Sequence, residues 1–232
     1  MDRSVGEMNV INDFQKRLVA RIVKKYPVNA DIIESNMSGK DDKTFADYFV
    51  SIDSNNILIE FKEHEYGVKK ECEKPLRRLL CEKINGYKKI SCRGHKIAWS
   101  DVPNSNTTLF DNYIYKVSQV YKIYFEDIKS DLLNASEFIE KFLNKDTGLT
   151  LEEMTEYLKF LQSLTNEGIP TDGRIFQAKL YSYHKGDLLE NEITQDDFLK
   201  LIKLIKEKSN LVSKFNDENK PTNSFCGPRK RR

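Results

Sequence analysis

Three charged residues lie in two apolar stretches of the chain at a spacing that could build a catalytic site. Glu60 and Lys62 end the stretch ILIEFK (57–62), and Asp47 lies upstream in FADYF (45–49). A charge in such a setting is costly unless it is paired or faces a site. Two converging carboxylates suit a hard divalent cation such as Mg²⁺. A lysine beside them can orient or deprotonate an attacking water and offset charge on a phosphate, so the set fits phosphodiester hydrolysis.

A structural salt bridge is the alternative interpretation of the same residues. An acidic residue two positions before a lysine occurs four times in this chain, at 41–43, 60–62, 127–129 and 218–220. Only 60–62 lies in a strong strand pattern with an aspartate in a neighbouring strand pattern. The strand context of 60–62 therefore favours a catalytic site over a structural salt bridge.

The surrounding pattern predicts a helix, three strands, a second helix and a fourth strand. Apolar residues recur at helical spacing over 9–26, and Pro27 ends that pattern. Strands are predicted at 30–36, 45–52 and 57–62, with DSNN (53–56) as the turn of a hairpin. A helix is predicted over 69–85, with Gly86 as its end, and a strand over 96–100. Alternate side chains of a strand share a face, so Glu60 and Lys62 point the same way.

This arrangement resembles the PD-(D/E)xK nuclease superfamily over about residues 8–100. The resemblance implies an α/β fold with a restriction-endonuclease-like αβββαβ core. It also implies that Asp47 and Glu60 are metal ligands, that the carbonyl of Phe61 is a further ligand, and that Lys62 is the catalytic lysine. The implied cofactor is Mg²⁺ or Mn²⁺, and the second core helix would turn a basic or polar residue toward the site.

The chain departs from the superfamily pattern at two points. Ala46 stands where the motif has proline. Members also often supply a glutamate from the first helix. The predicted helix offers only Asp13 and Gln15, with Glu7 just upstream, and Glu34 on the first strand is an alternative. The sequence therefore does not decide between one metal ion and two.

The charge distribution predicts a polyanionic partner. The net charge is +2, but residues 69–96 contain ten Lys or Arg and three Glu, and the last four residues are all basic. Lys70, Lys74, Arg77 and Arg78 fall on one face of the predicted helix and are the candidate nucleic-acid contacts. DNA is favoured over RNA, because the superfamily mostly cleaves DNA. The alternative is that these side chains form a solvated face or pair with the acidic remainder of the chain.

Beyond residue 103 the pattern predicts a mostly helical C-terminal extension. Helices are expected over 110–128 and 134–143, after the Thr150–Glu153 capping box, and from residue 194; residues 174–183 fit a strand or a helix. We therefore expect a nuclease-like core at 1–103, a helical extension at 104–215 and a flexible basic tail at 216–232. The extension could serve homo-oligomerisation or a protein partner.

Composition excludes several classes of protein. The 232 residues are 39% hydrophobic and 32% charged, and no apolar run approaches the roughly 18 residues that a membrane helix needs, so a membrane-spanning, collagen-like or wholly disordered chain is excluded. Four cysteines without a CxxC pair favour neither a zinc knuckle nor a disulfide framework. The first residues lack a signal-peptide pattern, so a cytoplasmic protein is expected.

Together these patterns predict a metal-dependent nuclease, with a role in restriction or antiphage defence suggested by analogy alone. Strand specificity and endo or exo preference stay open. One alternative is a catalytically silent nuclease-fold module that binds nucleic acid or a partner protein. Another is an α-helical interaction protein in which the 45–62 hairpin is incidental.

Overall fold

A mixed sheet flanked by helices organises the protein. The computed structural model describes residues 5–25, 32–37, 46–52, 55–101, 107–168, 177–184 and 187–194. Across these ranges the strands form one eight-stranded sheet in the order β6-β5-β4-β3-β2-β1-β7-β8. Neighbouring strands are antiparallel except for β3 and β4, which are parallel. Their bounds are β1 Ile32–Met37, β2 Tyr48–Ile52, β3 Asn55–His64, β4 His95–Ser100, β5 Thr108–Asn112, β6 Leu133–Asn134, β7 Gln177–His184 and β8 Asp187–Thr194.

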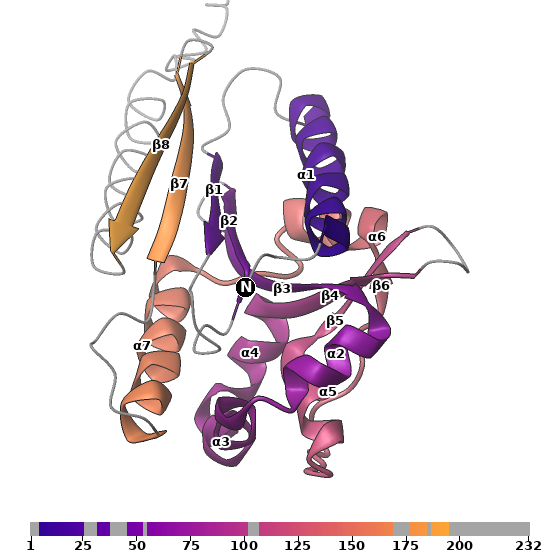
Figure 1. The fold of residues 1–232 in the computed structure, drawn as a ribbon, viewed down its shortest axis with the longest axis vertical. Helices are drawn as coiled ribbons and strands as arrows, with labels where there is room; N and C mark the ends of the chain where they lie inside the picture. The colour runs from indigo at the N-terminus through magenta and orange to yellow at the C-terminus, as the bar shows by residue number, and fades with distance from the viewer. Residues whose placement is uncertain are drawn as a thin grey trace, which may run out of the picture.

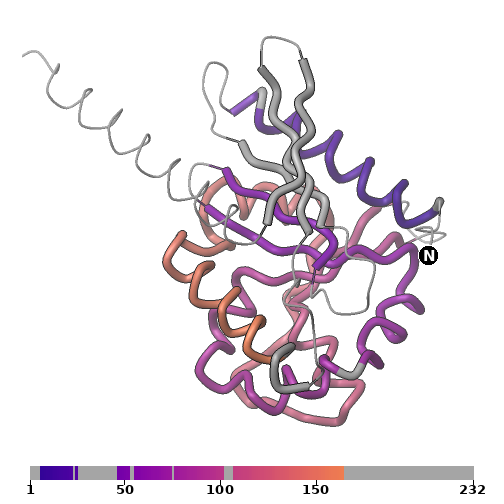
Figure 2. The backbone as a smooth tube through the Cα atoms, turned by 60° about the vertical axis from the view of Figure 1, so that its left-hand side comes forward, coloured from indigo at the N-terminus to yellow at the C-terminus, as the bar shows by residue number. Residues whose placement is uncertain are grey.

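Helices cover both faces of the central strands (Figure 1, Figure 2). Helices α1 and α6 pack on one face, where the core contains Phe14, Phe61, Phe110 and Phe138. The other helices pack on the opposite face around Leu58, Leu80 and Tyr113. The bounds are α1 Val5–Lys25, α2 Glu65–Cys72, α3 Pro75–Lys83, the short 3₁₀ helix η1 Ile84–Tyr87, α4 Lys88–Gly94, α5 Tyr113–Val120, α6 Ala135–Leu143 and α7 Leu151–Gly168.

The predicted hairpin is present as strands β2 and β3. Phe49 pairs with Leu58, and Tyr48 pairs with Ile59, in an antiparallel register. Tyr48 and Ile59 belong to the core under α1, whereas Phe49 and Leu58 belong to the core on the other face. This alternation follows from the period of two along a strand. Glu60 shares the face of Leu58, so the motif carboxylate points away from α1.

The single helix predicted over 69–85 is wrong, because the chain forms α2 and α3 with a break between them. Lys74 has an extended backbone (φ −65°, ψ 140°), and Pro75 opens α3. Proline disfavours helical geometry in the residue before it but suits the first position of a helix. The basic residues of this region are thus divided between two helices and do not share one face. From Val5 to Ser100 the elements run helix, three strands, several short helices, strand.

The mostly helical C-terminal extension is also corrected by the structure. Residues 108–112 form β5, which pairs with β4, so the sheet continues across the expected boundary at residue 103. Strands β7 and β8 extend the other end of the same sheet through β1. The helix predicted over 110–128 is reduced to α5, Tyr113–Val120.

Two predicted helix starts in the C-terminal part are confirmed. Asn134 accepts hydrogen bonds from the first turn of α6, and Glu137 completes the capping box. Thr150 and Glu153 cap α7 in the same reciprocal way. The helix expected from residue 194 and the basic tail lie outside the described residues. No helix of the described ranges is long and apolar enough to cross a membrane.

Candidate active site

The structure brings Asp47, Glu60 and Lys62 together where the hairpin meets α2. Lys62 Nζ lies 2.5 Å from Glu60 Oε1 and 3.7 Å from Asp47 Oδ2. Glu60 and Lys62 lie two residues apart on β3 and therefore share a face. Asp47 comes directly before β2, and antiparallel pairing places it beside the end of β3. Residues from two neighbouring strands thus share one ion-pair cluster.

Backbone hydrogen bonds hold Asp47 in this position. The Asp47 N–H donates to the Ile59 carbonyl at 3.0 Å, and the Phe61 N–H donates to Asp47 Oδ2 at 3.0 Å. The Phe61 ring packs between Phe14 and Tyr48, with ring centroids 5.6 and 5.9 Å away. Both the carboxylate and the strand that carries Glu60 and Lys62 are therefore anchored. The role of the Phe61 carbonyl as a metal ligand stays a prediction.

Two further carboxylates reach the same ammonium group. Glu7 Oε1 lies 3.3 Å from Lys62 Nζ, and Glu71 Oε2 lies 3.4 Å from it. Helix α1 begins at Val5, so Glu7 lies in its first turn and supplies a first-helix glutamate that the predicted helix bounds excluded. An acidic residue in a first turn is itself a helix-start signal, and it could have extended the predicted helix to Glu7.

Asp13, Gln15 and Glu34 do not belong to this described cluster. Asp13 pairs with Arg17 at 2.8 Å, and Gln15 Nε2 donates to the Tyr48 hydroxyl at 3.3 Å. Glu34 lies on β1, and its side chain is outside the described part of the structure.

Glu71 connects Lys62 to a buried network that the sequence did not reveal. Its carboxylate is 2.5 Å from Lys74 Nζ, accepts from Arg77 Nε at 2.9 Å, and accepts from the Tyr113 hydroxyl at 3.1 Å. The Arg77 side chain has no exposed surface. The break before Pro75 lets the start of α3 turn Lys74 and Arg77 back toward the end of α2. Pro75 is the sequence signal for this break, and it could have predicted the network.

The predicted nucleic-acid contacts therefore separate into two groups. Lys74 and Arg77 face Glu71, and a buried guanidinium bound to a carboxylate is not available to a phosphate backbone. Lys70 and Arg78 remain at the surface. The Lys70 ammonium lies 5.1 Å from the centre of the exposed Tyr66 ring, and Arg78 pairs with Glu82 at 3.0 Å with 69% of its side chain exposed.

The buried carboxylates of this cluster have opposite electrostatic environments. Glu60 is 2% exposed, and burial raises its pKa well above the ordinary value; the nearby charges of Asp47 and Glu71 raise it further. Burial also acts to raise the pKa of Glu71, but Arg77, Lys62 and Lys74 outweigh it, and the pKa of Glu71 falls below its ordinary range. Burial opposes the charge of Lys62, yet the carboxylates around it raise its pKa, so this group stays an ammonium.

The donor set fits a divalent cation held by Asp47 and Glu60. Among the described residues, Glu60 Oε2 is buried without a hydrogen-bond partner. Both carboxylates lie within 3.7 Å of one nitrogen, so small side-chain rotations could bring them onto one ion. Negative charge also surrounds Glu60, and the carboxylates of Asp47 and Glu71 raise its pKa. Among the described residues no group of three or more His, Cys, Asp or Glu is arranged as a metal site, and the Lys62 ammonium lies close to the carboxylates of Asp47 and Glu60.

Comparison with other proteins gives no independent assignment. No protein-family model, curated protein or solved structure matches this chain. The likeness to the PD-(D/E)xK superfamily therefore depends on the motif residues and on the order of the elements.

Proposed function

We propose that this protein is a metal-dependent nuclease that hydrolyses phosphodiester bonds on a restriction-endonuclease-like core. The observation that carries the proposal is the convergence of Asp47, Glu60 and Lys62 from two neighbouring strands. A structural salt bridge needs one carboxylate for one lysine, whereas here the lysine meets several carboxylates and one of these keeps a buried oxygen without a partner. Such an excess of oxygen ligands suits a divalent cation.

The order of the elements gives a second, weaker line of support. Helix α1, strands β1 to β3, the helical segment α2 to α4 and strand β4 follow the αβββαβ sequence of that superfamily. Strand β4 lies beside β3 in parallel, and the helical crossover packs on the face of the sheet that carries Glu60. This order of elements supports the proposed superfamily resemblance.

Each motif residue has a distinct proposed task. Asp47 and Glu60 hold the metal ion, which when bound supplies a Lewis acid to the phosphate oxygen. In the ion-pair cluster the surrounding carboxylates raise the pKa of Lys62, so the group is an ammonium there. As an ammonium it can orient the attacking water and offset negative charge on the phosphate. Glu7 and Glu71 hold that ammonium at the end of β3.

DNA is the substrate that the superfamily resemblance favours, and restriction or antiphage defence is the role that analogy suggests. The exposed Lys70 of α2 and Arg78 of α3 are cationic groups that could contact a phosphate backbone. A cytoplasmic location and a partner bound through the C-terminal helices belong to the same proposal.

The decisive experiment is a cleavage assay of the full chain on double-stranded DNA, single-stranded DNA and RNA. We expect cleavage with Mg²⁺ or Mn²⁺ and none with excess chelator. Asp47→Asn and Glu60→Gln should lower the rate at least a hundredfold while folding is retained. The matched controls Asp127→Asn and Glu156→Gln change exposed carboxylates away from the motif and should cleave normally.

A catalytically silent nuclease-fold module is the second candidate. One observation favours it: the Lys62 side chain is only 15% exposed and already meets the carboxylates of Glu7, Glu60 and Glu71. On this alternative the cluster is a structural ion-pair network. Wild-type protein that binds nucleic acid or a protein partner but cleaves no nucleic acid with any divalent cation would establish the module and overturn the nuclease.

A further inference from the structure

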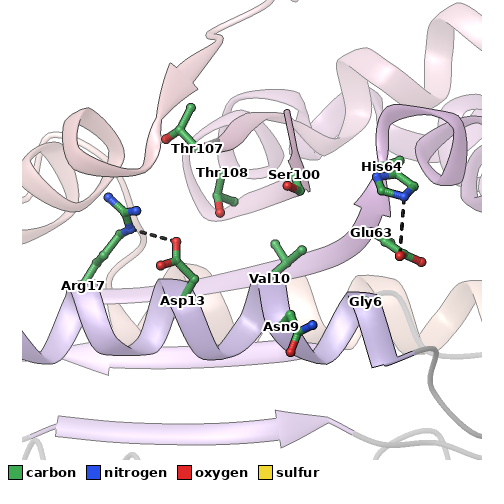
Figure 3. Close-up of a pocket in the computed structure, with 10 residues that line it drawn as sticks. All are labelled: Gly6, Asn9, Val10, Asp13, Arg17, Glu63, His64, Ser100, Thr107 and Thr108. Atoms are coloured by element: carbon green, nitrogen blue, oxygen red, sulfur yellow. Dashed lines mark hydrogen bonds and ion pairs between the residues drawn. The ribbon is translucent and has the colours of Figure 1, made fainter. Parts of the chain in front are cut away.

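A polar pocket of about 370 Å³ lies beside the candidate active site, between the first half of α1 and the ends of β3, β4 and β5. Figure 3 shows Asp13 and Arg17 of α1 facing Thr107 and Thr108 across the pocket, with Glu63 and His64 at the opposite end. The remaining lining residues are Gly6, Asn9, Val10 and Ser100. The volume is within the range of small-molecule sites.

The pocket and the active site share two chain segments, although no active-site residue lines the pocket itself. Glu63 follows Lys62, and Gly6 precedes Glu7, so each of two pocket residues is a direct neighbour of an active-site residue. Neighbouring Cα atoms are about 3.8 Å apart. The Glu63 side chain lies against Gly6, where α1 approaches the end of β3. Lys62 Nζ lies 3.3 Å from Glu7 in the first turn of α1, so a chain bound at Lys62 would reach the pocket by passing that turn.

The lining does not suit a phosphate group. The Arg17 guanidinium lies 2.8 Å from Asp13, and His64 lies 3.5 Å from Glu63. Both basic side chains of the lining therefore already face a carboxylate. A phosphate would meet these carboxylates as like charges. A neutral ligand avoids that repulsion.

The uncharged polar side chains favour a ligand with several hydrogen-bonding groups. The uncharged polar side chains of the lining belong to Asn9, Ser100, Thr107 and Thr108. These groups offer hydroxyl and amide donors and acceptors, and Val10 adds an apolar wall. An unpaired nucleobase is neutral, has apolar faces and carries donors and acceptors along its edges.

We propose that this pocket binds one unpaired nucleobase adjacent to the phosphodiester bond at the active site. The inference rests on the proposed nuclease function and adds a base-binding subsite to it. The backbone phosphate lies at Lys62, and the neighbouring base enters between α1 and β5. Recognition of this kind requires a single strand or a base turned out of a duplex.

The first test scans an abasic nucleotide through a single-stranded oligonucleotide substrate of the full-length protein with Mg²⁺. At one position next to the cut, removal of the base should lower kcat/KM about tenfold, which corresponds to about 1.4 kcal/mol. Asn9→Ala should lower kcat/KM on the intact substrate and should make cleavage insensitive to the abasic position. Asn12→Ala is the matched control, since Asn12 is an exposed asparagine of α1 outside the pocket, and it should keep the wild-type abasic effect. Cleavage that is indifferent to every abasic position would overturn the pocket and leave the nuclease standing.

The second test reads binding without cleavage, so failure of the nuclease and failure of the pocket are distinguishable. Short single-stranded oligonucleotides and their fully abasic analogues are titrated with chelator, and backbone amide shifts are recorded. Intact oligonucleotides should shift the amides of Gly6, Thr107 and Thr108, and abasic analogues should not. Thr108→Val removes one hydroxyl with little change of shape and should weaken these shifts. Equal shifts with both ligands, or none at these amides, would overturn the proposal.

Discussion

Glu71 Oε2 lies 3.4 Å from Lys62 Nζ, so a residue at the end of α2 helps to hold the lysine at the end of β3. The same carboxylate is held in turn by Arg77 and Tyr113. Lys62 is thus positioned by both the hairpin and the α2–α3 junction. The stability of the core and the geometry of the candidate site are therefore coupled through one ammonium group.

Replacing Lys62 should destabilise the protein as well as stop catalysis. Lys62→Met leaves Glu7, Glu60 and Glu71 near one another without their shared cation. Breaking a buried ion pair by removing one partner costs about 3 kcal/mol. Chemical unfolding at neutral pH measures this loss. Lys69→Met, which changes an exposed lysine of α2, is the control and should stay within about 0.5 kcal/mol of wild type. A stable Lys62→Met protein would show that the cluster does not depend on this ammonium.

Glu60 should make the protein less stable as pH rises. Its pKa is raised by burial and by the like charges of Asp47 and Glu71, so the folded state binds the proton more tightly than the unfolded state. The free energy of unfolding therefore falls as pH rises above the ordinary value of 4.5. Glu60→Gln mimics the protonated form. Its free energy of unfolding relative to wild type should therefore increase as pH is raised from 5 to 8. Urea unfolding across this range, without divalent cations, measures the difference. A constant difference between the two proteins would contradict the raised pKa.

Glu71 should show the opposite pH dependence. Burial opposes its charge, but the cations of Arg77, Lys62 and Lys74 lower its pKa. The stabilisation is present above the ordinary pKa of 4.5 and is lost as pH falls below it. Glu71→Gln should therefore cost about 3 kcal/mol at pH 7, with a smaller difference from wild type at pH 3. Glu73→Gln, an exposed neighbour, should show neither effect. A deficit that is the same at both pH values would show that hydrogen bonding alone, without charge, accounts for the role of Glu71.

The motif pair and the hairpin were predictable because both depend on local rules. The period of two in a strand places Glu60 and Lys62 together, and the turn residues between the strands bring Asp47 beside them. The same rules place Tyr48 and Ile59 under α1. The geometry follows from a short segment of sequence and needs no distant contact.

The remaining carboxylates were not predictable from the same rules. Glu71 reaches Lys62 because α2 ends before Pro75, and a helix drawn through Pro75 hides that approach. Glu7 joins the cluster only because α1 begins at Val5. The helical spacing of Phe110 and Tyr113 predicts a helix there, whereas pairing of β5 with β4 decides the structure of residues 108–112. Tertiary pairing overrides a short local pattern in such segments.

A divalent cation should stabilise the protein through Asp47 and Glu60. A ligand that binds only the folded state raises the free energy of unfolding, by about 2.7 kcal/mol at a hundred times its Kd. Thermal unfolding with Mg²⁺ or Mn²⁺ should show an increase in Tm that depends on cation concentration. Asp47→Asn and Glu60→Gln should remove this increase, and Asp127→Asn, at an exposed position, should keep it. An equal increase in all four proteins would show that the cation binds elsewhere.

The basic residues near α2 and α3 should contribute unequally to nucleic-acid binding. Lys70 and Arg78 are exposed, so each can release counterions from a bound phosphate, whereas Arg77 is buried against Glu71. The double variant Lys70→Ala, Arg78→Ala should flatten the slope of log Kd against log salt by about two units. Arg77→Ala should leave the slope unchanged and lower stability by about 3 kcal/mol.

Fluorescence anisotropy with labelled DNA in chelator measures binding without cleavage. Lys16→Ala, Arg21→Ala removes two exposed cations of α1 and is the matched control for lost charge. If this control flattens the slope as much as the α2–α3 variant does, binding follows overall charge, and the path of the nucleic acid does not pass over Lys70 and Arg78.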